Sequence, residues 1–327
     1  MATKNSLTDL EGIRIGHATD TERMTGCTVV LFDPDALGGV FVRGTAAGTR
    51  QIDSLFPRHF VERLQGVFLT GGSAFGLDAT AGVMRYMEEQ GRGLDVLYAR
   101  VPIVPTAVIF DLSLGDHLAR PSAEMAYQAC RSAGDGRIEE GSVGAGTGAS
   151  VGKLYGIDNA CKGGLGTCSR VFSDGLVVAA LTVVNAYGDV VEPSTGKVLA
   201  GARDPSDPTR FCNAGKVLAD RGEVPEGPFT NTVLSIVATN AALSKVEACR
   251  LARSASVGIS RAVSPAHALF DGDVVFAVST GSHAAEPNSL AGAAVELVSC
   301  SILRAVREAD GFGLIPAWKD LEKGDND

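Results

Sequence analysis

Two long apolar segments constrain the fold of this chain more than any other feature of its sequence. Segments 176–185 and 231–240 are rich in Val, Leu, Ile and Ala. Apolar, β-branched runs of this length are typical of buried strands. Ala-rich segments with helix signals alternate with the apolar runs along the chain. The sequence therefore predicts a layered α/β domain in which helices cover the sheets.

The length and charge of the chain exclude several classes of function. Its 327 residues are enough for one large domain, and we expect a single domain over 1–327. The net charge of −9 argues against a nucleic-acid surface. No apolar run reaches the roughly 18 residues that a membrane span needs, and residues 1–9 lack the apolar core of a signal peptide. We expect neither nucleic-acid nor membrane partners, and a cytoplasmic location.

The cysteines and histidines predict no disulfide framework and no metal site. The chain has 7 cysteines at scattered spacings without a CxxC pair, so we expect free thiols in a reducing compartment. The 5 histidines show no HExxH or paired spacing, which argues against zinc. We expect the protein to work without a metal and without a cofactor.

Two glycine clusters, 144–148 and 162–167, do not match a phosphate-binding loop, because Lys162 precedes the glycines instead of following them. No acidic residue follows in a βαβ frame, so a dinucleotide site is also disfavoured. Such turns let the backbone approach other backbone or a substrate closely. Three glycines are therefore candidate substrate-binding positions: Gly144, Gly146 and Gly164.

Other segments carry local structural signals. Segments 28–33 and 39–44 predict separate strands, and a helix is expected from a Ser73 cap to about residue 89. Further helices are expected from Ser122, from a capping box of Ser244 and Glu247, and from about 288 to 308. Ser73 follows a strand and a glycine turn, but the G-x-S-x-G nucleophile elbow fails because Phe75 stands at its last position.

Thr232 lies where a polar, Pro- and Gly-rich stretch meets a buried strand. That stretch, about 188–230, reads as a single long loop, and such loops are often functional. If the Asn231–Thr232 bond were cut, Thr232 would hold a free α-amine beside its hydroxyl, and thus a base beside a nucleophile. Taken locally, Asn and Thr also suit an ordinary loop-to-strand boundary. The local sequence alone favours that ordinary reading.

Three polar residues follow or precede apolar strands. Asn185 ends an apolar run; such residues usually form turns, but a neutral amide is also a good oxyanion donor. Asp271 and Asp273 precede the apolar run 274–278. They fit either an ordinary Asp-Gly turn or a functional site.

An ordered set of motifs resembles the DmpA-type self-processing aminopeptidases, which include β-peptidyl aminopeptidases and share a fold with ornithine acetyltransferase. The resemblance spans most of the chain. It rests on 12–17 (GIRIGH), 70–77 (TGGSAFGL), 144–148 (GAGTG), 162–167 (KGGLGT), Asn185, Asn231-Thr232 and Asp271-Gly272-Asp273.

The resemblance implies a four-layer αββα sandwich that cuts itself into residues 1–231 and 232–327. By the motif, Thr232 is the nucleophile and Asn185 contributes to the oxyanion hole. Asp271 and Asp273 stand where better-studied members carry Ser and Glu, and residues near Thr106 lack the acidic residue of the aminopeptidase branch.

The predicted function is an N-terminal-nucleophile hydrolase that releases N-terminal amino acids from small peptides, amides or esters, assembled as a homo-oligomer, a tetramer by resemblance. Two alternatives stay open. One is an acyltransferase of the ornithine acetyltransferase type, and the other is an unprocessed, non-catalytic homologue.

Overall fold

The computed structural model describes residues 4–221 and 231–322. Its largest sheet has 9 strands, in the order β10-β11-β16-β18-β2-β4-β7-β3, with β1 paired to β2. These strands are β1 (Ile13–Asp20), β2 (Thr25–Val42), β3 (Thr49–Arg50), β4 (Arg63–Thr70), β7 (Thr106–Val108), β10 (Gly164–Val171), β11 (Val177–Asn185), β16 (Thr232–Ala241) and β18 (Val274–His283).

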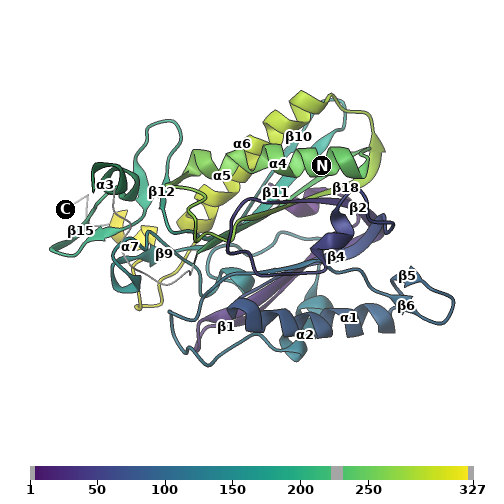
Figure 1. Cartoon of the computed structure of the whole chain (residues 1–327), viewed down its shortest axis with the longest axis horizontal. Helices are drawn as coiled ribbons and strands as arrows, with labels where there is room; N and C mark the ends of the chain where they lie inside the picture. The colour runs from purple at the N-terminus through teal and green to yellow at the C-terminus, as the bar shows by residue number, and fades with distance from the viewer. Residues whose placement is uncertain (1–3, 222–230, 323–327) are drawn as a thin grey trace.

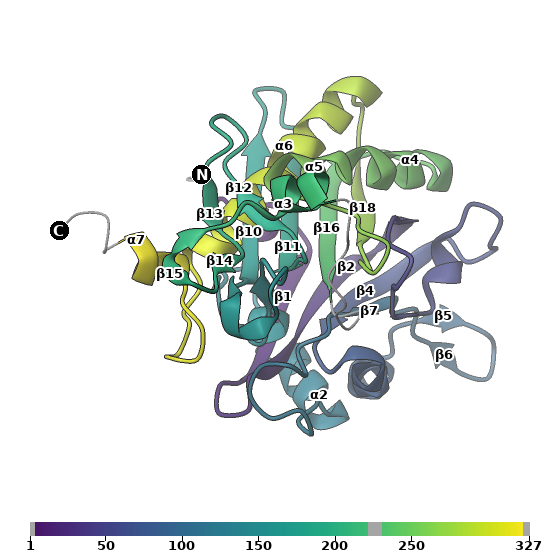
Figure 2. The same cartoon turned by 60° about the vertical axis from the view of Figure 1, so that its left-hand side comes forward.

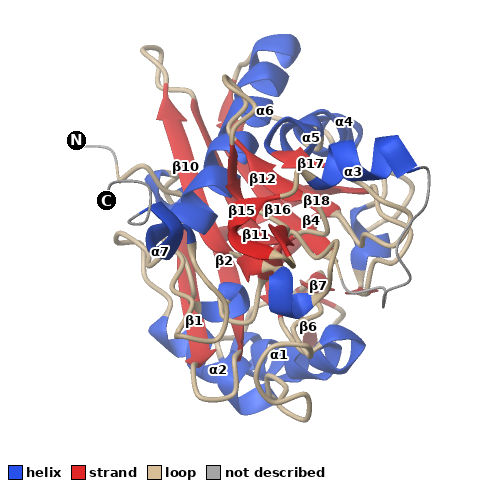
Figure 3. Cartoon of the chain, turned by 90° about the vertical axis from the view of Figure 1, so that its left-hand side faces the viewer, coloured by secondary structure: helices blue, strands red, loops and turns tan. Residues whose placement is uncertain are grey.

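Helices cover this sheet on both sides. Figure 1 shows α4 (Lys245–Ala255), α5 (Val257–Ala262) and α6 (Pro287–Arg307) on one side, and α1 (Thr80–Glu89) and α2 (Ala123–Ser132) on the other. Figure 3, which colours strands and helices separately, shows the strands between the helical layers. The αββα arrangement predicted from the sequence is confirmed.

β2 makes one continuous sheet out of two strand layers. Its first part pairs with β1 and β4, and its last part pairs with β18. The register with β4 shifts between Leu31 and Ala36, around Pro34, where a proline cannot donate to the ladder. The sequence-based prediction of two separate strands here was wrong, because one strand continues through the irregularity.

Three apolar clusters fill the spaces between the layers. One lies between α4–α6 and the β10–β11–β16 face, another between the two strand layers, and the third under α1 and α2. β16 shows how its residues divide: Val233 and Val237 belong to the first cluster, and Leu234 and Ile236 to the second. A strand buried on both faces in this way explains the nearly continuous apolar sequence.

The remaining elements are short, and several lie within the stretch predicted as one long loop. Figure 2 shows β12–β15, α3 and α7 gathered at one side of the molecule. The long-loop prediction is wrong for residues 188–221, and residues 222–230 lie outside the described part. The short elements are β5 (Leu94–Asp95), β6 (Arg100–Val101), β8 (Ser150–Val151), β9 (Cys161–Lys162), β12 (Asp189–Val191), β13 (Val198–Ala200), β14 (Arg203–Asp204), β15 (Asp207–Phe211), β17 (Val263–Ser264), α3 (Ala214–Arg221), α7 (Trp318–Glu322) and the 3-10 turns Leu7–Asp9, Ile52–Leu55, Ser73–Ala79, Gly144–Gly146 and Ile157–Asn159.

Most predicted helix starts are confirmed, and one is wrong. Ser122 caps α2 through its hydroxyl, and Ser244 with Glu247 forms the capping box of α4. Ser73 does not cap a helix: it is the first residue of a 3-10 turn and has a left-handed backbone with φ 53°. The glycine-rich turn before it, not a hydroxyl cap, starts the helical segment.

The prediction that every thiol is free was wrong. Cys168 of β10 and Cys300 of α6 form a disulfide, with Cα atoms 6.1 Å apart. The scattered spacing hid this pair because the two residues are 132 positions apart.

α6 is long and apolar enough to cross a membrane, judged by length and composition. Its most apolar 18-residue stretch is 56% buried inside the protein. It packs against β10 and β11 as a core helix, which accounts for its composition without a membrane.

Candidate active site

The structure brings the predicted nucleophile and the predicted oxyanion residue side by side. Thr232 is the first residue of β16 and lies directly opposite Asn185, the last residue of β11. Both side chains are buried. Directly opposed residues of antiparallel strands have Cβ atoms about 4.5–5.5 Å apart. Strand pairing thus places an amide next to the Thr232 hydroxyl.

The peptide bond between Asn231 and Thr232 is held in place by the facing turn. The Asn231 carbonyl oxygen accepts a hydrogen bond of 2.9 Å from the Gly272 N–H. The Thr232 hydroxyl lies 2.5 Å from the same oxygen. A Cβ on Gly272 would lie only 2.8 Å from Thr232 Oγ1. Glycine therefore lets this turn approach both the hydroxyl and the carbonyl.

The Asp271-Gly272-Asp273 turn brings both predicted carboxylates to the site. Asp273 Oδ1 accepts the Val233 N–H at 2.7 Å, and Asp273 Oδ2 lies 2.6 Å from His267 Nδ1. Asp271 Oδ2 accepts the Ala268 N–H at 2.7 Å. Asp273 thus contacts the backbone of the residue that follows Thr232.

The Asp271 carboxyl lies in an environment that favours its protonated form. Burial, together with the neighbouring Asp273 carboxylate, raises the pKa of Asp271 to about 7. Asp271 forms a parallel β-bridge with Asn231. Across residues 4–221 and 231–322, Asp271 Oδ1 and Asn231 Oδ1 are both buried without a hydrogen-bond partner. A proton on Asp271 would turn one of these acceptors into a donor.

Lys153 is a site residue that the sequence-based prediction missed. It follows β8, and its Nζ donates to Asn185 Oδ1 at 2.8 Å and to the Asn185 carbonyl oxygen at 3.0 Å. Burial lowers the pKa of Lys153 to about 7, although the charges of Asp271 and Asp111 oppose that shift. Lys153 belongs to no recognisable sequence motif. Its apolar neighbours in the sequence were the only sign that the lysine would be buried.

Several donors and acceptors fix the orientation of the Asn185 side chain. Its Oδ1 also accepts the Ser150 N–H at 3.0 Å, and its Nδ2 donates to the Phe110 carbonyl at 3.0 Å. The amide therefore has a defined direction before any substrate binds.

The other candidate residues lie in packed positions. At each of the three predicted glycines, an added Cβ would lie within 2.5 Å of another atom. Those atoms are Thr28 Oγ1 for Gly144, the Leu165 backbone nitrogen for Gly146 and the Ala305 carbonyl oxygen for Gly164. These glycines serve close packing, and their substrate-binding role stays a prediction. No group of three or more potential metal ligands occurs among the described residues.

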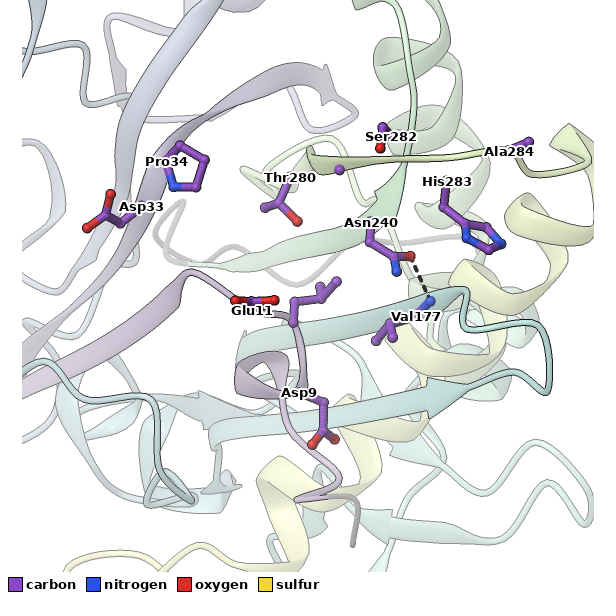
Figure 4. Close-up of a pocket in the computed structure, with 12 residues that line it drawn as sticks. Asp9, Glu11, Asp33, Pro34, Val177, Asn240, Thr280, Ser282, His283 and Ala284 are labelled. Carbon is purple, nitrogen blue, oxygen red and sulfur yellow. Dashed lines mark hydrogen bonds between the residues drawn. The ribbon is translucent and has the colours of Figure 1, made fainter. Parts of the chain in front are cut away.

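A separate pocket lies at the opposite end of β16, and Figure 4 shows its lining. It has a volume of about 770 Å³ and includes Asp9, Glu11, Asp33, Asn240 and His283. Because β16 has 10 residues, its two ends are separated by roughly 30 Å. This pocket shares no residue with the Thr232 site.

Comparison with solved structures identifies the fold. The chain resembles the L-aminopeptidase D-Ala-esterase/amidase of Ochrobactrum anthropi, described as a variant of the Ntn hydrolase fold, with a TM-score of 0.75 and 20% identity over 98% of this chain and 93% of that one. A Burkholderia sp. beta-aminopeptidase has a TM-score of 0.71 and 22% identity over the same shares. The fold is that of the N-terminal-nucleophile hydrolases.

Sequence comparison identifies the family. A model of peptidase family S58 matches residues 5–314. An uncharacterized aminopeptidase of Mycobacterium leprae is 37% identical over 99% of this chain and 96% of its own length. A 6-aminohexanoate-oligomer endohydrolase of Paenarthrobacter ureafaciens is 30% identical over 83% of this chain and 74% of its own. The chain belongs to peptidase family S58 and is a peptide hydrolase.

Proposed function

We propose that this protein cuts its own Asn231–Thr232 bond and then uses Thr232 to hydrolyse small peptides, amides or esters. The observation that carries the proposal is the position of the Thr232 hydroxyl, 2.5 Å from the Asn231 carbonyl oxygen. That oxygen also accepts the Gly272 N–H. A nucleophile and a polarised carbonyl are thus held together at the junction of a strand.

Self-cleavage begins with attack by the Thr232 oxygen on the Asn231 carbonyl carbon. The hydroxyl loses its proton, the C–N bond breaks, and the Thr232 nitrogen takes up a proton to become an amine. Water then hydrolyses the resulting ester, releasing the Asn231 carboxylate and restoring the hydroxyl. The Gly272 N–H stabilises the oxyanion during attack because it already points at that oxygen.

In the processed enzyme, the same parts act on a substrate. The Thr232 α-amine has a pKa of about 7.7–8.0 in model peptides, so it accepts the hydroxyl proton and later gives it to the leaving group. Departure of the Asn231 carbonyl leaves the Gly272 N–H available for the substrate oxygen. Asn185 supports the same oxygen, and losing one such donor typically slows a reaction about 100–1000-fold.

The names of the relatives and the site chemistry support the proposed substrate class. Some relatives of this chain are named aminopeptidases, and others are named 6-aminohexanoate-oligomer endohydrolases. We propose release of N-terminal amino acids from small peptides, amides or esters. We also propose a homo-oligomer, a tetramer by resemblance, in the cytoplasm.

Turnover assays separate the hydrolase from its alternatives. Aminoacyl anilides should be hydrolysed to free amine, whereas an acyltransferase should move the acetyl group from acetyl-ornithine to glutamate. Acyl transfer without anilide hydrolysis would show that the protein is an acyltransferase and not a hydrolase. An intact chain inactive in both assays would favour the non-catalytic homologue.

A further inference from the structure

His267 occupies an unusual position beside the two carboxylates. It lies between β17 and β18 and has a left-handed backbone with φ 57°. Its side chain is only 10% exposed, and Nδ1 lies 2.6 Å from Asp273 Oδ2. A left-handed backbone is strained for a non-glycine residue because its Cβ lies too close to the following carbonyl oxygen. Strain of this kind persists where the surrounding structure requires it, and it often marks functional positions.

Ionising both Asp271 and Asp273 is unfavourable, because the two carboxylates are close, buried and of like charge. Their hydrogen bonds differ. Each oxygen of Asp273 has a partner, Val233 N–H for one and His267 for the other. The Asp271 carboxyl accepts only the Ala268 N–H among the described residues. The negative charge is therefore more stable on Asp273, and the proton is more stable on Asp271.

Other titratable groups also face this pair. The positive charge of Lys153 acts on Asp271, and so does that of His267. Tyr187 lies near Asp271 as well, and burial together with that carboxylate raises the pKa of Tyr187 to about 12. Of these groups, His267 alone has a hydrogen bond to Asp273 in the described structure. His267 is thus the side chain that distinguishes one carboxylate from the other.

We propose that His267 is a positioning residue that holds the negative charge of the pair on Asp273 and leaves the proton on Asp271. The ionised Asp273 then keeps the Val233 N–H, and with it Thr232, in place. The protonated Asp271 supplies a neutral donor beside Asn231. This inference rests on the proposed self-cleavage for its catalytic consequence, whereas the charge distribution itself does not depend on cleavage.

Two substitutions isolate the hydrogen bond from the backbone strain. Asn and Gly both tolerate a left-handed backbone, and neither titrates. His267→Asn keeps an N–H donor near Asp273, whereas His267→Gly removes it. Both are compared in a Thr232→Ala background, so that the chain stays intact whether or not the wild-type protein cuts itself.

The melting temperatures of this pair should diverge as pH rises. An N–H donor stabilises Asp273 only when that carboxylate is charged. At about pH 2–3, below the ordinary aspartate pKa of about 3.9, the Asn and Gly variants should differ mainly by a constant backbone contribution. By about pH 7 the Asn variant should gain a further 2–4 °C, roughly the shift expected for one charged hydrogen bond. A difference that does not change with pH would overturn the proposal.

The catalytic consequence is measured with Thr232 present. His267→Gly should slow self-cleavage about tenfold at neutral pH, and His267→Asn should restore most of the rate. The acid side of the pH–rate profile should move to higher pH in the Gly variant only, because the Asp271–Asp273 pair takes up its second proton more readily.

Equal self-cleavage rates in the Gly variant and the wild type, or identical pH–rate profiles in the Asn and Gly variants, would contradict the proposal. Absence of cleavage in the wild type would refute the proposed function instead, and the melting experiment would still decide the role of His267.

Discussion

Ionisable side chains gather at both ends of β16, but they are buried at one end and line an open pocket at the other. At the Thr232 end, Lys153, Asp271 and Asp273 are buried and hydrogen-bonded to neighbours. At the Asn240 end, the pocket in Figure 4 has three carboxylates and a histidine around an open volume. Glu11 and Asp33 are exposed there.

The difference shows that burial of charge, not the size of a cavity, distinguishes the candidate active site. Burial moves the pKa values of Lys153 and Asp271 from opposite sides to about 7. Groups poised near neutral pH can exchange protons with little cost. The exposed carboxylates of the far pocket are solvated, so they have no comparable reason to react.

The largest expected effect on activity should come from removing the Thr232 hydroxyl at one end of β16. Thr232→Ala should abolish self-cleavage and hydrolysis, while Thr232→Ser should keep both because it retains the hydroxyl and the amine. The matched control is Thr280→Ala at the rim of the far pocket, which should leave both rates unchanged. Mass spectrometry and anilide hydrolysis measure the two activities. Self-cleavage or anilide hydrolysis by the Thr232→Ala variant would show that the Thr232 end of β16 is not the active site.

Removal of Lys153 should have the next largest effect. Lys153→Met removes the lysine donor from both Asn185 oxygens, so the amide is held less firmly, by the Ser150 N–H and the Phe110 carbonyl. We expect hydrolysis to fall about 100–1000-fold, as for other lost oxyanion support, and stability to fall by about 1–3 kcal/mol. The exposed Lys197 gives the control: Lys197→Met should change neither the rate nor the melting temperature. Near-normal hydrolysis by Lys153→Met would argue that Asn185 needs no support.

Asp271→Asn should make the folded chain more stable in a pH-dependent way. The pKa of Asp271 is raised from 3.8 to about 7, so the native state prefers the protonated carboxyl. Its ionisation costs nothing below about pH 4 and the full penalty above about pH 7. The gain from Asn should therefore grow across this range, to no more than about 4 kcal/mol. Thermal unfolding of the wild type and of Asp271→Asn, followed against pH, measures this gain. A gain that shrinks with rising pH would contradict the raised pKa.

The smallest effect should come from the histidine of the far pocket. The ring of His283 lies 3.6 Å from an exposed Asp174 carboxylate, and such surface pairs contribute about 0–1 kcal/mol. His283→Gln should leave self-cleavage and hydrolysis within about twofold of wild type. A loss as large as that of His267→Gly would show that the far end of β16 also serves the reaction.

Much of this arrangement could be predicted from the sequence, because local patterns and a set of motifs described it. The strand after Asn231, the capping box at Ser244 and the positions of Asn185 and the Asp271–Asp273 turn all follow from short segments. The structure brings these segments together by strand pairing.

The rest depends on contacts between distant segments, which leave no local pattern. Lys153 and His267 become site residues only because folding buries them beside Asn185 and Asp273. The Gly272 N–H is a backbone donor that no residue type reveals. The Cys168–Cys300 bond likewise joins β10 to α6, far apart in the chain.

The most direct test is the mass of the purified wild-type protein after denaturation and reduction. Reduction is needed because the Cys168–Cys300 disulfide joins the segments on either side of the proposed cut. Self-cleavage at Thr232 predicts two species, residues 1–231 and 232–327. A single full-length mass from a protein that still hydrolyses its substrates would show that Thr232 does not act as an N-terminal nucleophile.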